Sequence, residues 1–312
     1  MPARRLDPEV AALIADLNAD PITIEAAAPD QLQIEFQRLL ARLQTQPTAE
    51  YHGTVRDRSI PVDGRLVAVR EYRPDVVPEL SHTIVYMHGG GWVLGNLDTA
   101  DRFARTLSTG TAARVVSVDY RLGPTHPFPA AFDDCIGVLT AIREEGDPWV
   151  GVAGDSAGGN LAAAVALAAP DRGVTVDAQL LIYPALDAGL SGSSYATCAE
   201  GFLLTRDAMR FYWDSYAGDW DRRDERLSPL DTADLSLAPP TVIATAGFDP
   251  LQDDGVQFAL RLIAAGVPTI YMPFPGLVHG FLDFTDLSVA ALRARSSLVL
   301  AFNSLRMSLA DE

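Results

Sequence analysis

A strand pattern that runs directly into a helix pattern through a glycine-rich turn is the feature that most constrains this fold. Residues 149–153 form a short apolar run, residues 154–158 read Gly-Asp-Ser-Ala-Gly, and a small-residue helical pattern follows. A serine at the tip of such a sharp turn needs glycine two positions before and after it, because the backbone is crowded there. The pattern therefore predicts that Ser156 is exposed at the turn, with the Ala157 amide of the helix start beside its Oγ. Alone, the pattern also fits an ordinary glycine-rich turn of an α/β sheet.

A second glycine-rich loop follows an earlier strand pattern. Residues 83–87 are rich in β-branched side chains and continue into His-Gly-Gly-Gly-Trp at 88–92. Consecutive glycines lose much backbone entropy on folding, and their usual use is positive φ or close approach of bare amides to a ligand. We expect the amides of Gly89 and Gly90 to join that of Ala157 in an oxyanion hole. The alternative is a flexible glycine loop.

A serine hydroxyl is a weak nucleophile unless a neighbouring base takes its proton. Of the five histidines, only His279 follows Ser156, and it lies just after the strand pattern at 269–273. A hydrolase with nucleophile, acid and histidine in that chain order has its histidine in a loop after a late strand. The order therefore predicts His279 as the general base, although a lone histidine is more often a buried structural residue.

Three aspartates compete for the role of the acid that orients this histidine. Asp249, Asp253 and Asp254 follow the strand pattern at 240–247. Asp249 is nearest the strand end, and Pro250 would start a helix at its first position. The other two would then lie in the first helical turn, where the helix dipole favours acids without any catalytic task. We therefore favour Asp249.

The motifs, taken in order, resemble those of the bacterial hormone-sensitive lipase-like esterases, a family of α/β-hydrolases. They are His-Gly-Gly-Gly at 88–91, Gly-Asp-Ser-Ala-Gly at 154–158, Asp-Pro-Leu at 249–251 and His-Gly-Phe at 279–281. Residues 119–130 resemble a fifth family segment, Asp-Tyr-Arg-Leu-Ala-Pro-Glu-His-x-Phe-Pro-Ala, but Gly123 replaces alanine and Thr125 replaces glutamate. The resemblance extends from about Tyr51 to the C-terminus, and it implies hydrolysis of short- to medium-chain carboxylic esters.

Strand and helix patterns alternate along most of the chain. The strand patterns are residues 54–60, 65–72, 84–87, 115–120, 150–153, 179–183, 242–246 and 269–273. The first two are joined through Asp-Gly and predict an antiparallel hairpin, whereas helical connections make the later strands parallel. We expect an α/β-hydrolase fold with a mostly parallel sheet of about eight strands, the active site at its carboxyl edge, and a final helix over 287–309.

Two further segments have no place in a minimal sheet. The N-terminal region, 1–45, contains two amphipathic helix patterns, and the 185–240 insertion is far longer than the dozen or so residues that a crossover needs. The insertion contains seven aromatic residues: Tyr195, Phe202, Phe211, Tyr212, Trp213, Tyr216 and Trp220. In the resembling family, N-terminal helices form part of a cap over the active site. We therefore expect cap helices in 1–45 and a catalytic domain over 46–312 that carries the rest of the cap around 185–240.

Composition excludes several classes of partner. The 24 basic and 41 acidic residues give a net charge of −17, which argues against nucleic acid and anionic membranes. No phosphate-loop or Cys/His metal spacing is present, so we expect neither cofactor nor metal. Cys135 and Cys198 do not make a disulfide framework, and no apolar stretch approaches the ~18 residues of a membrane span. We expect reduced thiols and a cytoplasmic location. A homodimer is possible, and the sequence does not decide the oligomeric state.

These features predict a serine carboxylesterase. Ser156 would form the acyl-enzyme, His279 would act as base and Asp249 would orient it. The fold also resembles the plant gibberellin receptors, which have lost the catalytic histidine, and His279 argues against that class. An amidase or lactonase with the same three residues is a second alternative that the sequence leaves open.

Overall fold

An eight-stranded sheet organises the part of the chain described by the computed structural model, residues 5–19, 29–76 and 82–310. Its order is β1-β2-β4-β3-β5-β6-β7-β8. The strands are β1 Gly53–Val62, β2 Arg65–Pro74, β3 His82–Met87, β4 Arg114–Val118, β5 Trp149–Asp155, β6 Gln179–Ile182, β7 Thr241–Phe248 and β8 Thr269–Val278. β2 pairs antiparallel with both β1 and β4, and every later pairing is parallel. The expected mostly parallel sheet is therefore confirmed.

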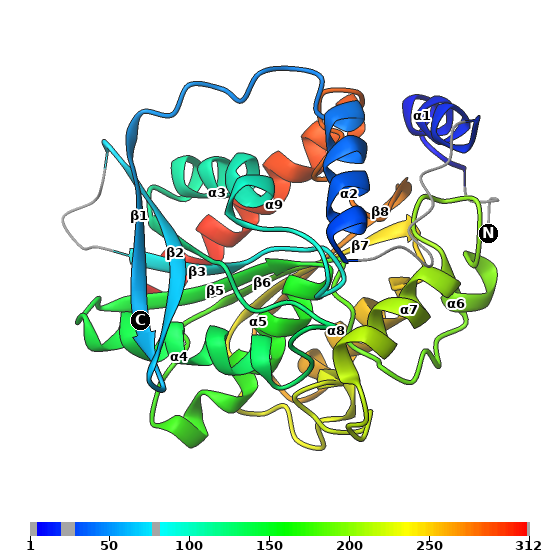
Figure 1. Cartoon of the computed structure of the whole chain (residues 1–312). Coiled ribbons are helices and arrows are strands. Elements are labelled where there is room, and N and C mark those ends of the chain that lie inside the picture. Colours follow the sequence, from blue (N-terminus) through cyan, green and yellow to red (C-terminus); the bar gives the residue numbers. More distant parts are fainter. Residues whose placement is uncertain (1–4, 20–28, 77–81, 311–312) are drawn as a thin grey trace.

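Helices cover both faces of this sheet. They are α1 Pro8–Ala19, α2 Pro29–Leu43, α3 Leu97–Thr111, α4 Ala130–Glu144, α5 Ala157–Ala168, α6 Ser194–Thr197, α7 Arg206–Ala217, α8 Gln252–Ala264 and α9 Val289–Ala310, with short 3₁₀ turns at Pro170–Arg172 and Pro229–Asp231. α3 and α9 lie on one face, and α4, α5 and α8 on the other (Figure 1). Among the described residues, no helix is long and apolar enough to cross a membrane.

Strand periodicity divides the core between the two faces. On β3, Ile84 and Tyr86 belong to the apolar cluster that contains residues of α3 and α9, whereas Val85 and Met87 belong to the cluster with α4, α5 and α8. Successive side chains of a strand point to opposite faces, so a strand with helices on both sides is apolar throughout. The continuous run of hydrophobic residues in β3 follows from this position.

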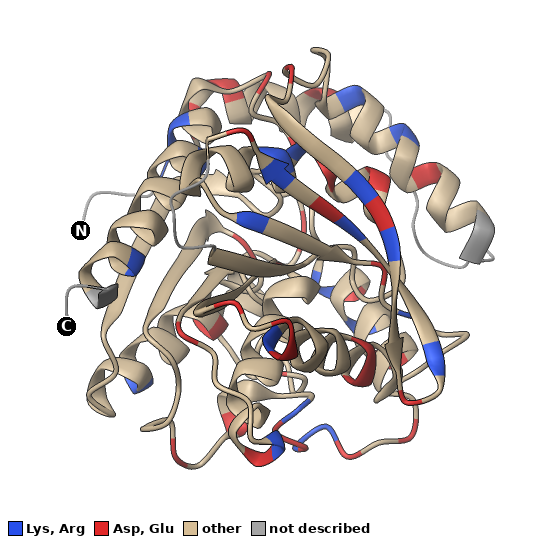
Figure 2. Cartoon of the chain, turned by 90° about the vertical axis from the view of Figure 1, so that its left-hand side faces the viewer, with Lys and Arg blue, Asp and Glu red and all other residues tan. Residues whose placement is uncertain are grey.

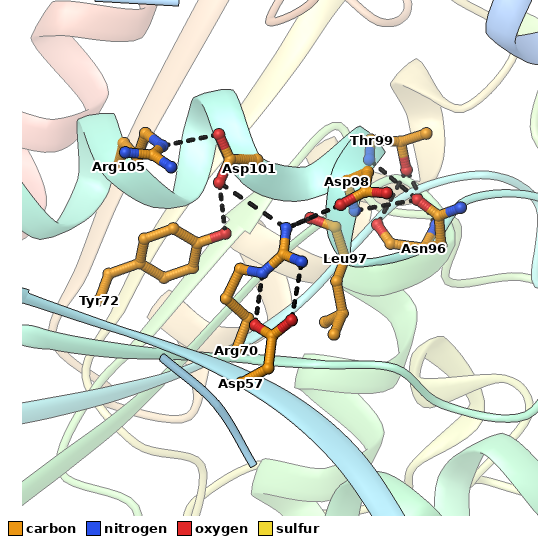
Figure 3. A network of polar contacts seen from close by, with 9 residues as sticks. All are labelled: Asp57, Arg70, Tyr72, Asn96, Leu97, Asp98, Thr99, Asp101 and Arg105. Carbon is orange, nitrogen blue, oxygen red and sulfur yellow. Dashed lines mark hydrogen bonds and ion pairs between the residues drawn. The ribbon is translucent and has the colours of Figure 1, made fainter. Parts of the chain in front are cut away.

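The predicted hairpin of β1 and β2 is confirmed, and a polar network joins it to α3. Its turn residues Asp63 and Gly64 both have positive φ, 46° and 79°. Arg70 of β2 donates two hydrogen bonds to Asp57 of β1, at 2.6 and 3.0 Å, and one to Asp98 of α3 at 2.8 Å (Figure 3). Acidic and basic residues alternate along this exposed hairpin (Figure 2). The network fixes the start of α3 against the sheet edge.

The carboxyl ends of the parallel strands point toward α2 and α7, which flank this edge of the sheet from opposite sides (Figure 1). The β5, β7 and β8 strands each end here, and the loops that follow them carry the residues singled out from the sequence. This arrangement follows the general rule that ligand sites of α/β sheets lie outside the carboxyl ends of the strands.

Candidate active site

Ser156 occupies the turn between β5 and α5 in a strained conformation, with φ 55° and ψ −119°. The flanking glycines are required by space. A Cβ at Gly154 would lie 2.0 Å from the carbonyl oxygen of Gly158, and a Cβ at Gly158 would lie 2.0 Å from that of Met87. Residues other than glycine rarely adopt such a positive φ, and they do so mostly at functional sites. The turn presents the Ser156 side chain beside the start of α5.

The structure brings Ser156, His279 and Asp249 into hydrogen-bond contact. His279 Nε2 lies 2.8 Å from Ser156 Oγ, and His279 Nδ1 lies 2.8 Å from Asp249 Oδ2. Because an ionised carboxylate can only accept, Nδ1 donates to Asp249. In the neutral imidazole, Nε2 is then the acceptor for the Ser156 hydroxyl. This tautomer is the one that can take a proton from the serine.

The other two aspartates of the 249–254 segment face away from His279. Asp253 Oδ2 accepts a hydrogen bond from the Ser194 amide at 3.0 Å. Asp254 Oδ2 accepts from the Leu186 amide and the Tyr195 hydroxyl, each at 3.0 Å, and burial raises its pKa well above the usual range. Both carboxylates therefore hold the beginning of the insertion against α8.

The helix after Asp249 starts later than the sequence predicted. α8 begins at Gln252 with Leu251 at its N-cap, so the expectation that Pro250 occupies the first helical position is wrong. Asp249 Oδ1 accepts from the Leu251 amide at 2.8 Å, and its carbonyl accepts from the Gln252 amide at 3.1 Å. Residues 249–252 therefore form a turn before the helix, and this turn fixes the buried Asp249 carboxylate.

The glycine loop differs from expectation at one position. The Gly89 amide donates to Asp155 Oδ1 at 3.0 Å, so the prediction that it is free for an oxyanion is wrong. In the described part of the chain, the amides of Gly90, Gly91 and Ala157 donate no hydrogen bond. Gly90 and Gly91 have φ of 124° and 62°. The sequence pattern did not single out Gly91, because nothing in it showed which of three adjacent glycines the carboxylate would engage.

Two side chains support this loop from behind. Burial lowers the pKa of His88 to about 4, so the ring is neutral at pH 7, and it stacks on Tyr120 at 4.4 Å between ring centres. The Tyr120 hydroxyl donates to the His88 carbonyl at 2.7 Å. Thr125, which stands in place of the family's glutamate, is exposed. Aromatic stacking and backbone contacts therefore hold the loop without that carboxylate.

A cavity of about 300 Å³ opens onto Ser156. Its apolar wall comes mainly from α1, α2 and the insertion: Ile14, Leu17, Phe36, Leu39, Leu40, Leu43, Leu203, Leu204, Met209 and Tyr212. Of the seven aromatics of the insertion, only Tyr212 lines it, whereas Trp213 and Tyr216 pack on Trp92. Asp283, Gln44 and Arg102 give the cavity a polar side.

Metal ligation and disulfides find no support in the described ranges. No group of three or more His, Cys, Asp or Glu side chains is placed to hold a metal ion there. Cys135 and Cys198 are both buried and no disulfide joins them, and Cys135 lies in α4 as the helical pattern indicated.

Comparison with known proteins places this site in a family. A family model described as the alpha/beta hydrolase fold matches residues 84–283. The chain belongs to the α/β-hydrolase family. Carboxylesterase NlhH of Mycobacterium tuberculosis is 40% identical to this α/β-hydrolase over 290 residues, which cover 89% of this chain and 90% of that protein. An acetyl esterase of Salmonella agona is 34% identical over 250 residues, covering 76% of each chain.

Solved structures agree with the sequence relatives. The crystal structure of a thermostable esterase from Pseudomonas putida ECU1011 superposes with a TM-score of 0.90, at 30% identity and 99% coverage of both chains. The expected α/β-hydrolase fold and the expected membership among the hormone-sensitive lipase-like esterases are confirmed. This membership identifies the α/β-hydrolase as a carboxylic ester hydrolase.

Proposed function

We propose that the chain is a serine carboxylesterase in which Ser156 is the nucleophile, His279 the general base and Asp249 the orienting acid. The observation that carries this proposal is the continuous hydrogen-bond path from Asp249 through His279 to Ser156, with both contacts at 2.8 Å, at the wall of an apolar cavity. The same geometry of nucleophile, base and orienting group recurs in unrelated acyl-transfer enzymes.

The geometry supports a two-step acyl transfer. Ser156 Oγ attacks the ester carbonyl carbon while its proton passes to His279 Nε2, and the carbonyl π electrons move onto the oxygen. Collapse of this tetrahedral intermediate breaks the bond to the alcohol oxygen, which takes the proton from His279. Water then attacks the acyl-enzyme with His279 again as base, and the carboxylic acid and free Ser156 are released.

The amides of Gly90, Gly91 and Ala157 are the donors proposed for the oxyanion. They have no competing acceptor in the described structure, and the Ala157 amide lies at the N-terminus of α5, where the helix dipole favours negative charge. Gly89 contributes differently, because its hydrogen bond to Asp155 fixes the path of the loop. One such donor is commonly worth ~10²–10³ in kcat.

The cap and the substrate range are also part of the proposal. Side chains of α1 and α2 and of residues 203–212 form the apolar wall of the cavity, which supports cap roles for the N-terminal region and the 185–240 insertion. A volume of about 300 Å³ is suited to short- and medium-chain acyl groups. The acetyl esterase relative is consistent with the short end of this range.

The decisive test is the alanine variant of the nucleophile. Ser156→Ala should lower ester turnover by roughly 10⁶ and leave the circular dichroism spectrum unchanged. Ser59→Ala, an exposed serine of β1, is the matched control and should keep full activity. A phosphonate probe should label Ser156 in the wild type. Labelling of another residue, or high activity in Ser156→Ala, would exclude the mechanism. A parallel assay of amides and lactones tests whether the enzyme is instead an amidase or a lactonase.

A further inference from the structure

A second cavity lies on the other side of Arg102 from the active-site cavity. Its volume is about 560 Å³, and it is lined by residues 46–51, by the middle of α3 and by α9. The segment between α2 and β1 arches over α3 and α9 at this place (Figure 1). Arg102 lines both cavities, and Arg105 and Arg295 line the second one only. Three arginines and two carboxylates, Asp286 and the exposed Glu50, therefore line this cavity.

Two of these arginines are neutralised by the protein itself. Arg102 Nη1 donates to Asp286 Oδ2 at 2.7 Å, and its Nη2 donates to the Gln46 carbonyl at 2.6 Å. Asp286 Oδ2 also accepts from the Gln46 amide at 2.9 Å. Arg105 Nε donates to Asp101 Oδ2 at 2.6 Å. Both carboxylates thus form their close ion pairs with arginines of α3.

Arg295 is a third cation of this cavity, and it forms no ion pair in the described part of the chain. Its Nη1 donates to Thr285 Oγ1 at 3.0 Å, while its buried Nε has no partner. Within the described ranges, no carboxylate oxygen lies within 4.0 Å of this guanidinium. Burial and the neighbouring Arg102 lower the pKa of Arg295, and the Asp286 carboxylate opposes this shift in part. A partly buried guanidinium that forms no ion pair is costly, and a bound anion would reduce that cost.

We propose that this second cavity is a binding site for a small organic anion with a carboxylate or phosphate group, held by Arg295 with Arg102 beside it. The planar fork of a guanidinium matches both groups through paired hydrogen bonds, which distinguishes it from a simple point charge. The cavity is too large for a monatomic ion alone, and its wall includes the apolar side chains of Val299 and Leu300. The ligand therefore carries an organic body as well as the anionic group.

Thermal stabilisation by anions tests the site on the full-length protein. Inorganic phosphate and butyrate are titrated separately, with sodium chloride adjusted to constant ionic strength. We expect each anion to raise the wild-type Tm by about 5 °C at a hundredfold excess over its Kd, because the ligand binds only the folded state. A response to phosphate alone or to butyrate alone would support the site and identify which group it prefers.

Variants of Arg295 separate this site from general salt effects and from binding near Ser156. Arg295→Gln should abolish the Tm response, and Arg295→Lys should weaken it about tenfold in anion concentration, because lysine keeps the charge and loses the fork. Arg293→Gln, an exposed arginine of the same helix, should respond like the wild type. If Arg295→Gln is poorly folded, Arg295→Met keeps the packing of the stem. The proposal is overturned if Arg295→Gln and Arg295→Met respond to the anions like the wild type, or if neither anion stabilises the wild type.

Discussion

The two cavities on either side of Arg102 differ in the sign of the charged side chains that form no ion pair among the described residues. In the active-site cavity, Asp155 and Asp283 have no cationic group within 4.0 Å among the described residues. Neutral donors serve them instead, the Tyr86 hydroxyl at 2.6 Å for Asp155 and the Gln44 amide at 3.3 Å for Asp283. In the second cavity, Arg295 is the arginine that forms no ion pair among the described residues and donates to Thr285 instead.

This difference matches the charges that each cavity would have to stabilise. Burial raises the pKa of Asp155, and burial together with Asp155 raises that of Asp283 to about 7. Carboxylates near His279 would favour the positive imidazolium of the proposed acyl transfer. The arginine-lined cavity instead favours a ligand with a permanent negative charge. Variants in one cavity should therefore leave the response of the other unchanged.

The largest expected effect beyond loss of the nucleophile is that of Asp249→Asn. It should lower kcat for p-nitrophenyl acetate on the order of 10⁴, because asparagine favours the wrong imidazole tautomer. The anion response of the second cavity should persist. Asp253→Asn is the control and should keep kcat within about threefold, since Asp253 contacts Ser194 and not His279. A large loss of kcat in Asp253→Asn would show that the orienting acid is wrongly assigned.

An intermediate effect is expected from Phe36→Ala on the α2 wall of the active-site cavity. Loss of this apolar contact should lower kcat/KM for p-nitrophenyl hexanoate about tenfold and that for the acetate much less, because only the longer chain reaches the wall. Ile34→Ala on the same helix is the control, since Ile34 is 62% exposed and does not line the cavity. An equal proportional loss at every chain length would mean that α2 does not shape the acyl site.

The smallest effect is a pH-dependent change in stability for Asp283→Asn. The pKa of Asp283 is about 7 in the folded protein and about 4 in an unfolded chain. Its contribution to stability is therefore present below pH 4 and is lost as the pH rises to 7. Asparagine cannot ionise, so the Tm of the variant relative to the wild type should rise by a few degrees between pH 4 and pH 8. Differential scanning calorimetry measures this trend, and a constant difference across the range would contradict it.

The parts of the site that the sequence predicted depend on local patterns. The glycine spacing around Ser156 is a local pattern, although the space at Gly158 is limited by the Met87 carbonyl of β3. His279 and Asp249 each follow a strand that the apolar pattern reveals. Chain order then places the three strand ends at one edge of the sheet. The fold was predictable for the same reason, because strand and helix periodicities alternate along the chain.

Contacts between distant segments were not predictable. The Gly89 amide is taken by Asp155 of another strand, which no spacing rule specifies. Most aromatics of the insertion do not line the active-site cavity, and Trp213 and Tyr216 instead pack on Trp92 of the glycine loop. Arg102 and Arg295 likewise meet only when α3 packs against α9. These contacts depend on partners that are far apart in the sequence and meet only in the folded chain.

The attachment of the insertion to the first turn of α8 has a consequence for protein engineering. Asp253 and Asp254 hold the Ser194 and Leu186 amides immediately beside Asp249. The insertion is thus fastened at its root, while its distal part, including Met209 and Tyr212, forms the wall of the cavity. A segment transplanted from another esterase needs backbone amides that meet these two carboxylates. Swaps that begin after Tyr195 preserve this anchor and exchange the part of the insertion that includes Met209 and Tyr212.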